Sequence, residues 1–496
     1  MHSKIAILKV FLWGSFVSLL GAVLIGVMNY LVRRYLANTF SIGEYGFLYA
    51  VFSLLTLLLA VVDLGMTQAG TILIAKNRAG NRPLRANSIY SFILLIKTSF
   101  GTALFLVLAL LSSFLMVHYY KFPGGQTVFL IVALLLIFQS AETVCMSAMD
   151  SAKAFGLKNL LQSAKILVIF LGIVLFSAQY GLMFAAGMFP AGALLSFITA
   201  YIILSRKFGL KAAPEITFNL RTFKHTWDLS RWIAVGLVGL TAISNMDSIL
   251  LAGLSTPERV GIYNIALPIV QIVQSIIILP VVFTPIVAEL WQHGRKEEIA
   301  KLTEAITSIL FILLWLALIT TLPLAKFIIT ILFGQQFTEA GTALTILCGG
   351  TIFFAAASFY VNALNSCGAA RQGAAIMLVG AMFNIICNVL LIPLWNINGA
   401  ATATALSYLF ICLAFYRVLR GRIPMHIPIK SVLYIALTGI IVTAASAWLY
   451  VQNFGLPEML AGTLLLDALL ALLLTPVWLK ITRELIHFYQ DKKKTD

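Results

Sequence analysis

The chain has 496 residues, of which 61% are hydrophobic and only 10% are charged, and its formal net charge is +16. Soluble globular domains carry about 25% charged residues, so this composition excludes a water-soluble fold of such length. The basic residues lie mostly in short connectors between apolar runs, which is typical of membrane proteins and argues against nucleic-acid binding.

Apolar runs recur along the whole chain, and a run of about 20 residues is long enough to cross a hydrocarbon layer of about 30 Å as a helix. The alternating ten-residue pattern of membrane barrels is absent from the sequence. We therefore predict an all-α polytopic membrane protein with about fourteen transmembrane helices. The predicted spans are 10–36, 46–75, 87–117, 126–150, 159–179, 182–204, 232–254, 261–289, 302–322, 341–364, 372–394, 399–417, 430–451 and 457–480.

Two segments need separate interpretation. The first apolar run is too long for a signal peptide and lacks a small-residue cleavage site, so we interpret it as a retained transmembrane helix. The stretch Phe327–Phe333 is apolar but too short to span, and it fits either an outer interfacial helix or a continuation of the ninth span.

Lysine and arginine are distributed unevenly between the two sides that these spans define. Of the 34 basic residues, 28 lie on the side that holds both termini. The positive-inside rule therefore predicts that both termini are cytoplasmic. The other six lie on the opposite side or within the membrane: Arg33, Arg34, Lys97, Lys121, Arg259 and Lys326.

An internal duplication organises the chain. A shift of 215 residues relates Leu36 to Leu251 and Gly46 to Gly261, and it brings the outer turn at residues 180–181 onto that at 395–396. We predict two pseudo-symmetric six-helix lobes related by an axis along the membrane normal. The expected domains are an N-terminal lobe (1–205), a basic connector (206–231), a C-terminal lobe (232–420), two further helices (428–482) and a basic tail (483–496).

Motifs for catalysis, metal binding and nucleotide binding are absent from the sequence. There is no P-loop, no His-Glu-x-x-His motif and no Gly-x-Ser-x-Gly elbow, and the five cysteines lie singly without ligand spacing. We expect no metal, no cofactor and no direct drive by ATP. This pattern favours a transporter over an enzyme.

Three segments stand out as motifs: Arg34–Gly46, Asp247–Tyr263 and the stretch from Asn384 to Ala401. They resemble segments of the oligosaccharide flippases (Wzx-type polysaccharide biosynthesis proteins) of the multidrug/oligosaccharidyl-lipid/polysaccharide exporter superfamily, except that Trp395 and Asn396 replace the usual Tyr-Gly. The resemblance covers roughly residues 10–420. It implies a two-lobe transporter in the bacterial inner membrane that flips an undecaprenyl-diphosphate-linked oligosaccharide for lipopolysaccharide or capsule biosynthesis. It also implies a pathway shared with a glycan polymerase and glycosyltransferases.

Charged residues within the spans are the candidate site residues, because an ionisable group in hydrocarbon is costly unless it has a partner or a polar cavity. A diphosphate headgroup needs cations along its route. We therefore expect Arg33, Arg34 and Lys97 to line a cationic substrate-binding cavity. The alternatives are that the arginines reach toward lipid headgroups, and that Lys97 forms a structural ion pair with Asp63 or Glu142.

Three carboxylates are candidates for gating or ion coupling. Asp247 lies at the depth of Arg33 and could latch an outer gate by pairing with one of the two arginines, unless its own lobe satisfies it. Asp63 and Glu142 lie toward the cytoplasmic halves of their spans and could carry protons or co-ions. For both, structural pairing with Lys97 or Lys165 is the alternative.

The leading functional hypothesis is translocation of a lipid-linked oligosaccharide by alternating access. A multidrug or cation antiporter of the same superfamily would require an acidic cavity, and a lipid II flippase would share the cationic one. A membrane-embedded glycan polymerase or transferase is a further alternative, against which the absence of a large loop argues.

Overall fold

The computed structural model describes residues 21, 24–212, 220–275, 279–425, 429–451 and 456–495. Residues 10–20, 22 and 23 of the first predicted span and residues 213–219 of the connector lie outside this part. Within it, every regular element is a helix and there is no strand. The prediction of an all-α fold is confirmed. The chain divides into two compact units, unit 1 (Met1–Thr241 and Thr256–Gly261) and unit 2 (Ala242–Ser255 and Ile262–Asp496).

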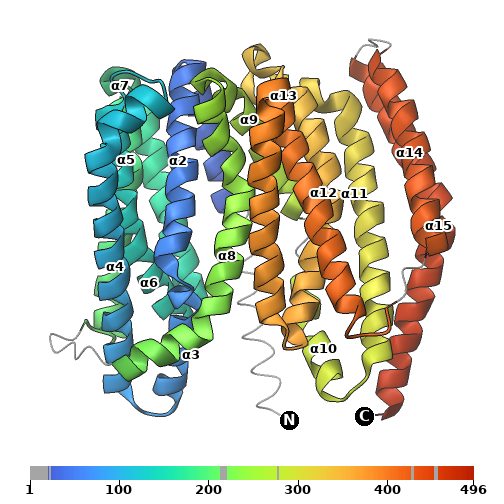
Figure 1. Cartoon of the computed structure of the whole chain (residues 1–496), viewed down its shortest axis with the longest axis horizontal. Helices are drawn as coiled ribbons and strands as arrows, with labels where there is room; N and C mark the ends of the chain where they lie inside the picture. The colour runs from blue at the N-terminus through green and yellow to red at the C-terminus, as the bar shows by residue number, and fades with distance from the viewer. Residues whose placement is uncertain are drawn as a thin grey trace. The chain divides into compact units, whose positions relative to one another are not determined.

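Unit 1 begins with a helix at residues 24–39. Within this unit α2, α4 and α6 run side by side, and α7 packs on α6 (Figure 1). An apolar core that contains Leu73, Ile93 and Val144 joins α3, α4 and α6. The remaining helices of unit 1 are α2 (Ile42–Asp63), α3 (Met66–Ala79), α4 (Pro83–Phe114) with a π-helical end (Leu115–Tyr119), α5 (Gln126–Ala133), α6 (Leu135–Ser151), α7 (Phe155–Lys207) and the first part of α8 (Leu220–Leu254).

The span predicted for residues 46–75 is not one continuous helix, because the structure has two helices there. Leu64 and Gly65 are both left-handed, with φ of 46° and 68°, and they separate α2 from α3. Two consecutive left-handed residues cannot continue a right-handed helix. Asp63 is therefore the last residue of α2, where its carboxylate lies at the negative end of the helix dipole.

Two long helices each contain a break at a predicted outer turn. In α7 the break is at Gly181, with φ of 73°, and in α13 it is at Asn396, with φ of 48°. The hydroxyl of Ser255 donates a hydrogen bond of 2.8 Å to the amide oxygen of Asn396, which holds this turn in unit 2. These breaks fall between the spans predicted on either side of each turn.

In unit 2, α11 contacts α12, α14 and α15, and α12 contacts α13 (Figure 1). An apolar cluster that contains Ile312, Ile435 and Leu470 attaches α14 and α15 to α11. Helix α11 continues through Pro323 to Phe333, so Phe327–Phe333 extends the ninth span. The helices of unit 2 are the end of α8, α9 (Pro257–Ser275) from Ile262 onward, α10 (Leu279–Gln292), α11 (Lys296–Phe333), a 3-10 turn (Gln335–Phe337), α12 (Ala340–Ser366), α13 (Ala370–Arg420), α14 (Ile429–Val451) and α15 (Leu456–Thr495).

Nine helices in the described ranges are long and apolar enough to cross a membrane, and α7 and α13 each contain two of the predicted spans. The protein is therefore a multi-pass membrane protein. The total of fourteen spans and the five domain boundaries stay predictions.

The two glycines related by the 215-residue shift lie against each other in unit 1. A capping box formed by Ser41 and Glu44 begins α2, and this first turn packs on the segment Thr256–Gly261. A methyl group added at Gly46 would overlap the carbonyl oxygen of Pro257 and lie 2.6 Å from the nitrogen of Gly261. A methyl group at Gly261 would lie 2.5 Å from the carbonyl oxygen of Ile42. Only hydrogen side chains permit this backbone approach.

We expect Gly46→Ala to lower the free energy of unfolding by about 1–3 kcal/mol, because two backbones must move apart to admit one methyl group. Gly26→Ala is the control, since a methyl group there meets nothing within 4 Å. Thermal unfolding of the purified variants in detergent measures both effects. Equal stability of the two variants would show that the contact tolerates a side chain.

Candidate functional site

Arg33 and Arg34 occupy different environments at the end of the first helix. The guanidinium of Arg33 is half-buried and lies over the ring of Tyr49, 4.6 Å from its centroid. Such a position favours a cation, because the face of an aromatic ring is negative. The Arg34 side chain is exposed, and its carbonyl oxygen accepts a hydrogen bond of 2.8 Å from Asn38. Adjacent helix residues point about 100° apart, which accounts for the difference.

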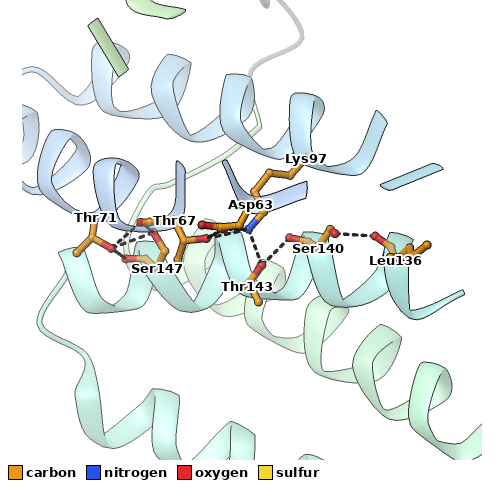
Figure 2. A network of polar contacts seen from close by, with 8 residues as sticks. All are labelled: Asp63, Thr67, Thr71, Lys97, Leu136, Ser140, Thr143 and Ser147. Carbon is orange, nitrogen blue, oxygen red and sulfur yellow. Dashed lines mark hydrogen bonds and ion pairs between the residues drawn. The ribbon is translucent and has the colours of Figure 1, made fainter. Parts of the chain in front are cut away.

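Lys97 lies near the middle of α4 and is the centre of a buried polar network (Figure 2). Its ammonium group donates to Asp63 Oδ1 at 2.5 Å, to Thr67 Oγ1 at 2.8 Å and to Thr143 Oγ1 at 2.9 Å. The Thr67 hydroxyl also donates to Asp63. The side chain of Lys97 is 3% exposed and that of Asp63 is 13% exposed. All three donors of the ammonium group are therefore used, and its charge is neutralised by Asp63.

The break between α2 and α3 makes this arrangement possible. It places Asp63 at the end of one helix and Thr67 in the first turn of the next, so that both reach Lys97 on α4. The positive charge of Lys97 also offsets the unfavourable position of Asp63 at a helix C-terminus.

Small hydroxyl groups extend the network along one face of α6 (Figure 2). Ser147 donates to the carbonyl oxygen of Thr67 at 2.9 Å and accepts a hydrogen bond of 3.0 Å from Thr71. Further along, Thr143 donates to the carbonyl oxygen of Ser140 at 2.9 Å. The spacing of 140, 143 and 147 puts these side chains on the same face of a helix. Polar contacts thus continue from the ion pair in both directions along α6.

Glu142 belongs to a second ion pair in unit 1. Its carboxylate accepts hydrogen bonds from Lys165 at 2.8 and 2.9 Å and from Ser196 at 2.7 Å, and its side chain is 3% exposed. The structure therefore pairs Lys97 with Asp63, and Glu142 with Lys165. Each carboxylate has the partner that the structural alternative expects.

Asp247 lies in a buried cluster within unit 2 and is 3% exposed. Tyr263 and Thr404 donate to Oδ2 at 2.5 and 2.6 Å, and the amide of Asn388 donates to Oδ1 at 2.8 Å. Asn384 joins the cluster through a hydrogen bond of 3.2 Å to Thr404. The donors come from α9 and from the two parts of α13 on either side of Asn396. Among the described residues, Asp247 forms no ion pair, which distinguishes it from Asp63 and Glu142.

Sequence reasoning did not single out Thr67, Thr143, Tyr263 or Thr404 as members of these clusters. Asn384 and Asn388 lie in the stretch from Asn384 to Ala401 that resembles the family. Their spacing of four residues puts both amides on one face of an apolar helix, and such a face needs polar partners. That signal could have directed attention to Tyr263 and Thr404.

Asp467 on α15 is a further carboxylate in unit 2, besides Asp247. The hydroxyl of Thr320 donates to its Oδ2 at 2.7 Å, whereas its buried Oδ1 has no hydrogen-bond partner among the described residues. A carboxylate with an unsatisfied oxygen is costly in an apolar environment. We therefore interpret Asp467 as a local packing defect with one unsatisfied oxygen, and not as part of a binding site.

We expect Asp467→Asn to raise the free energy of unfolding by about 1 kcal/mol, because the amide still accepts from Thr320 and carries no charge. Asp467→Ala is the comparison, since it also removes the acceptor for Thr320. Thermal unfolding in detergent measures both. If the asparagine variant were destabilised as much as the alanine variant, a role for the charge itself would follow.

Comparisons with known proteins place this geometry in context. Residues 11–291 match the family described as "Polysaccharide biosynthesis protein". An uncharacterized membrane protein of Methanocaldococcus jannaschii is 25% identical over 406 residues, or 79% of this chain and 80% of that protein. The capsular polysaccharide biosynthesis protein CapF of Staphylococcus aureus is 24% identical over 306 residues, or 59% of this chain and 74% of CapF. The probable low-salt glycan biosynthesis flippase Agl15 of Haloferax volcanii is 26% identical over 236 residues, or 46% of this chain and 49% of Agl15.

Solved structures of transporters share the fold. The lipid II flippase MurJ in an inward closed conformation superposes with a TM-score of 0.73 over 96% of this chain and 100% of that chain, at 16% identity. An inward-facing multidrug resistance MATE family transporter of the MOP superfamily superposes with a TM-score of 0.68 over 81% of this chain and 94% of that chain, at 11% identity. At such low identity these likenesses show the fold alone.

Proposed function

The chain belongs to the polysaccharide biosynthesis protein family, and we propose that it translocates a lipid-linked oligosaccharide across the cell membrane by alternating access. The names of two relatives, a capsular polysaccharide biosynthesis protein and a probable glycan biosynthesis flippase, support a glycan substrate. The fold shared with transporters supports movement of the substrate and not bond formation. The proposed cargo is an oligosaccharide linked to undecaprenyl diphosphate.

The buried pair of Lys97 and Asp63 is the observation that carries this proposal. A lysine at mid-helix in an apolar unit is costly, and here its whole donor capacity is used by one carboxylate and two hydroxyls. A phosphate oxygen of the substrate could replace Asp63 as the anion that Lys97 contacts. Because Lys97 is 3% exposed, this exchange requires a conformational change that separates the pair. The pair would then be the element with two states that alternating access needs.

Arg33 and Arg34 are the second part of the proposed cationic path. Arginine suits a diphosphate, because its planar guanidinium can donate two parallel hydrogen bonds. Arg34 is exposed and could meet a headgroup directly, whereas Arg33 would have to leave the ring of Tyr49. We propose that the two residues act at the end of the route, after Lys97.

Ion coupling is assigned to the carboxylates, with Asp247 as the leading candidate. Its three donors are neutral, so a proton or a sodium ion could bind there without displacing a basic residue. Asp63 could take up a proton when Lys97 turns to phosphate. Glu142 would couple translocation to an ion only if its ion pair with Lys165 separated. A latch between Asp247 and Arg33 or Arg34 stays a second proposal for the same carboxylate.

A cation antiporter is the second candidate function, and the Asp247 cluster is the observation that favours it. A buried carboxylate with neutral donors can bind a cation as well as a coupling ion. A lipid II flippase would also need cations that bind phosphate. The only support for this function is the fold that the chain shares with the lipid II flippase MurJ.

We further propose that the protein lies in the inner membrane with both termini in the cytoplasm. Its partners would be the glycosyltransferases that supply the lipid-linked oligosaccharide and the polymerase that uses it. No covalent step is assigned to this chain.

Deletion of the gene tests this proposal in cells. We expect surface polysaccharide to be lost and the lipid-linked oligosaccharide to accumulate on its synthetic side, because synthesis continues while export stops. Mass spectrometry of the lipid extract and staining of surface glycan measure both. Unchanged surface glycan together with increased sensitivity to organic cations would instead support the antiporter.

A further inference from the structure

The second part of α13 has an apolar face that is exposed and a partly polar face that is buried. Thr404 and Ser407 are buried, while Leu406 and Leu413 are 40% and 58% exposed. In a water-soluble protein this would be an inverted helix. In a membrane protein it means that the face with the leucines contacts hydrocarbon.

This apolar face ends in two arginines. At about 100° per residue, positions 406, 413, 417 and 420 fall within a sector of about 60° around the helix. Along one stripe, exposed leucines therefore lead to Arg417 and Arg420 in the last turn of α13. A membrane phospholipid has a matching order, because its apolar acyl chain leads to a charged phosphate headgroup.

The two arginines line a cavity of about 590 Å³ together with Leu413, Tyr416 and Gly421. Among the described residues, no carboxylate lines it. Both guanidinium groups are exposed, and in the described part of the chain neither has a hydrogen-bond or ion-pair partner. The neighbouring Arg422 differs, because it donates to the amide oxygen of Gln372 at 3.0 Å. The donors of Arg417 and Arg420 are thus available for a ligand.

We propose that this cavity binds the headgroup of an anionic membrane phospholipid, with the phosphate between Arg417 and Arg420 and the acyl chain along Leu413 and Leu406. Two guanidinium groups without a carboxylate select an anion. The apolar approach selects an anion attached to hydrocarbon, and basic residues next to a transmembrane helix attract anionic lipids. Tyr416 fits the boundary between headgroup and hydrocarbon, where tyrosine is enriched. This site does not depend on the identity of the transported substrate.

Compensation of the helix dipole accounts for a positive charge at the end of α13, but it does not account for the cavity. Arg82 and Arg85 provide a matched comparison at the start of α4. They have the same spacing of three residues and are also exposed. Replacing Arg82 and Arg85 with glutamine changes the net charge by the same amount as replacing Arg417 and Arg420.

Native mass spectrometry of the purified full chain tests the site. The protein is titrated with phosphatidylglycerol or, as the neutral match, phosphatidylcholine with the same acyl chains. We expect the wild type to bind phosphatidylglycerol about tenfold more tightly. The variant R417Q/R420Q should lose this preference, R82Q/R85Q should keep it, and R417K/R420K should keep most of it. Gel filtration checks folding, and the single variants R417Q and R420Q provide the readout if the double variant fails to fold.

Three results would overturn the proposal. They are equal binding of the two phospholipids by the wild type, an equal loss in R82Q/R85Q, and binding of undecaprenyl diphosphate at the arginine pair without binding of phosphatidylglycerol. The last result would reassign the cavity to the transported lipid. The first two results leave the proposed translocation of a glycan untouched, whereas the third would support it.

Discussion

Replacing Lys97 with methionine is expected to abolish glycan translocation and to destabilise the fold, whereas the double variant K97M/D63N is expected to recover stability without recovering translocation. The single variant leaves Asp63 in an apolar unit without its cation, and breaking a buried pair in this way costs about 3–5 kcal/mol. The double variant removes both charges, so no uncompensated carboxylate remains. If Lys97 also contacts the substrate phosphate, translocation stays lost.

Thermal unfolding and surface-glycan export, measured on the same variants, separate these two effects. The control pair is Lys158 and Asp150, joined at 2.7 Å, with both side chains 25% exposed. Exposed pairs contribute about 0–1 kcal/mol, so K158M/D150N should be stable and active. Export at the wild-type level by K97M/D63N would show that the pair is structural only.

Replacing Asp247 with asparagine is expected to leave the protein folded and to remove the coupling of translocation to an ion gradient. The amide keeps the shape of the carboxylate and an acceptor for Tyr263 and Thr404, but it can neither be protonated nor attract a cation. One coupled charge across about 100 mV is worth about 2.3 kcal/mol, which corresponds to about a fiftyfold change in the ratio of substrate between the two leaflets.

Proteoliposomes with an imposed membrane potential or ion gradient measure this coupling. Tyr263→Phe is the control, because it removes one hydrogen bond of 2.5 Å but keeps the charge of Asp247. It should retain the coupling. A D247N variant whose translocation still follows the gradient as the wild type does would exclude Asp247 as the coupling residue.

The fold could be predicted from the sequence because hydrocarbon imposes a simple rule, that long apolar runs form helices. The outer turns at Gly181 and Asn396 also fall where expected. The break after Asp63 could not be predicted, since Leu64 has no preference for a left-handed conformation and its neighbour Gly65 resembles other glycines in apolar helices. The assignment to the family is confirmed as well.

The partners of the charged residues were harder to predict. Lys97 could pair with Asp63 or Glu142, and only the rotation and depth of each helix decide between them. For the same reason Thr404 was missed, since it is one of two threonines in the run Ala401–Thr404 and only one of them faces Asp247. Ionisable residues in apolar spans can be found from the sequence, but the neutral groups that hold them require the packed structure.

Transport by the purified protein tests most directly whether this chain moves a phosphate-bearing glycolipid. A fluorescent oligosaccharide linked to undecaprenyl diphosphate is placed in proteoliposomes, and its exposure on the outer leaflet is followed with a quencher that cannot cross the membrane. We predict that the wild type equilibrates the lipid between leaflets while K97M/D63N does not. No equilibration by the wild type, together with gradient-driven uptake of an organic cation, would contradict the account.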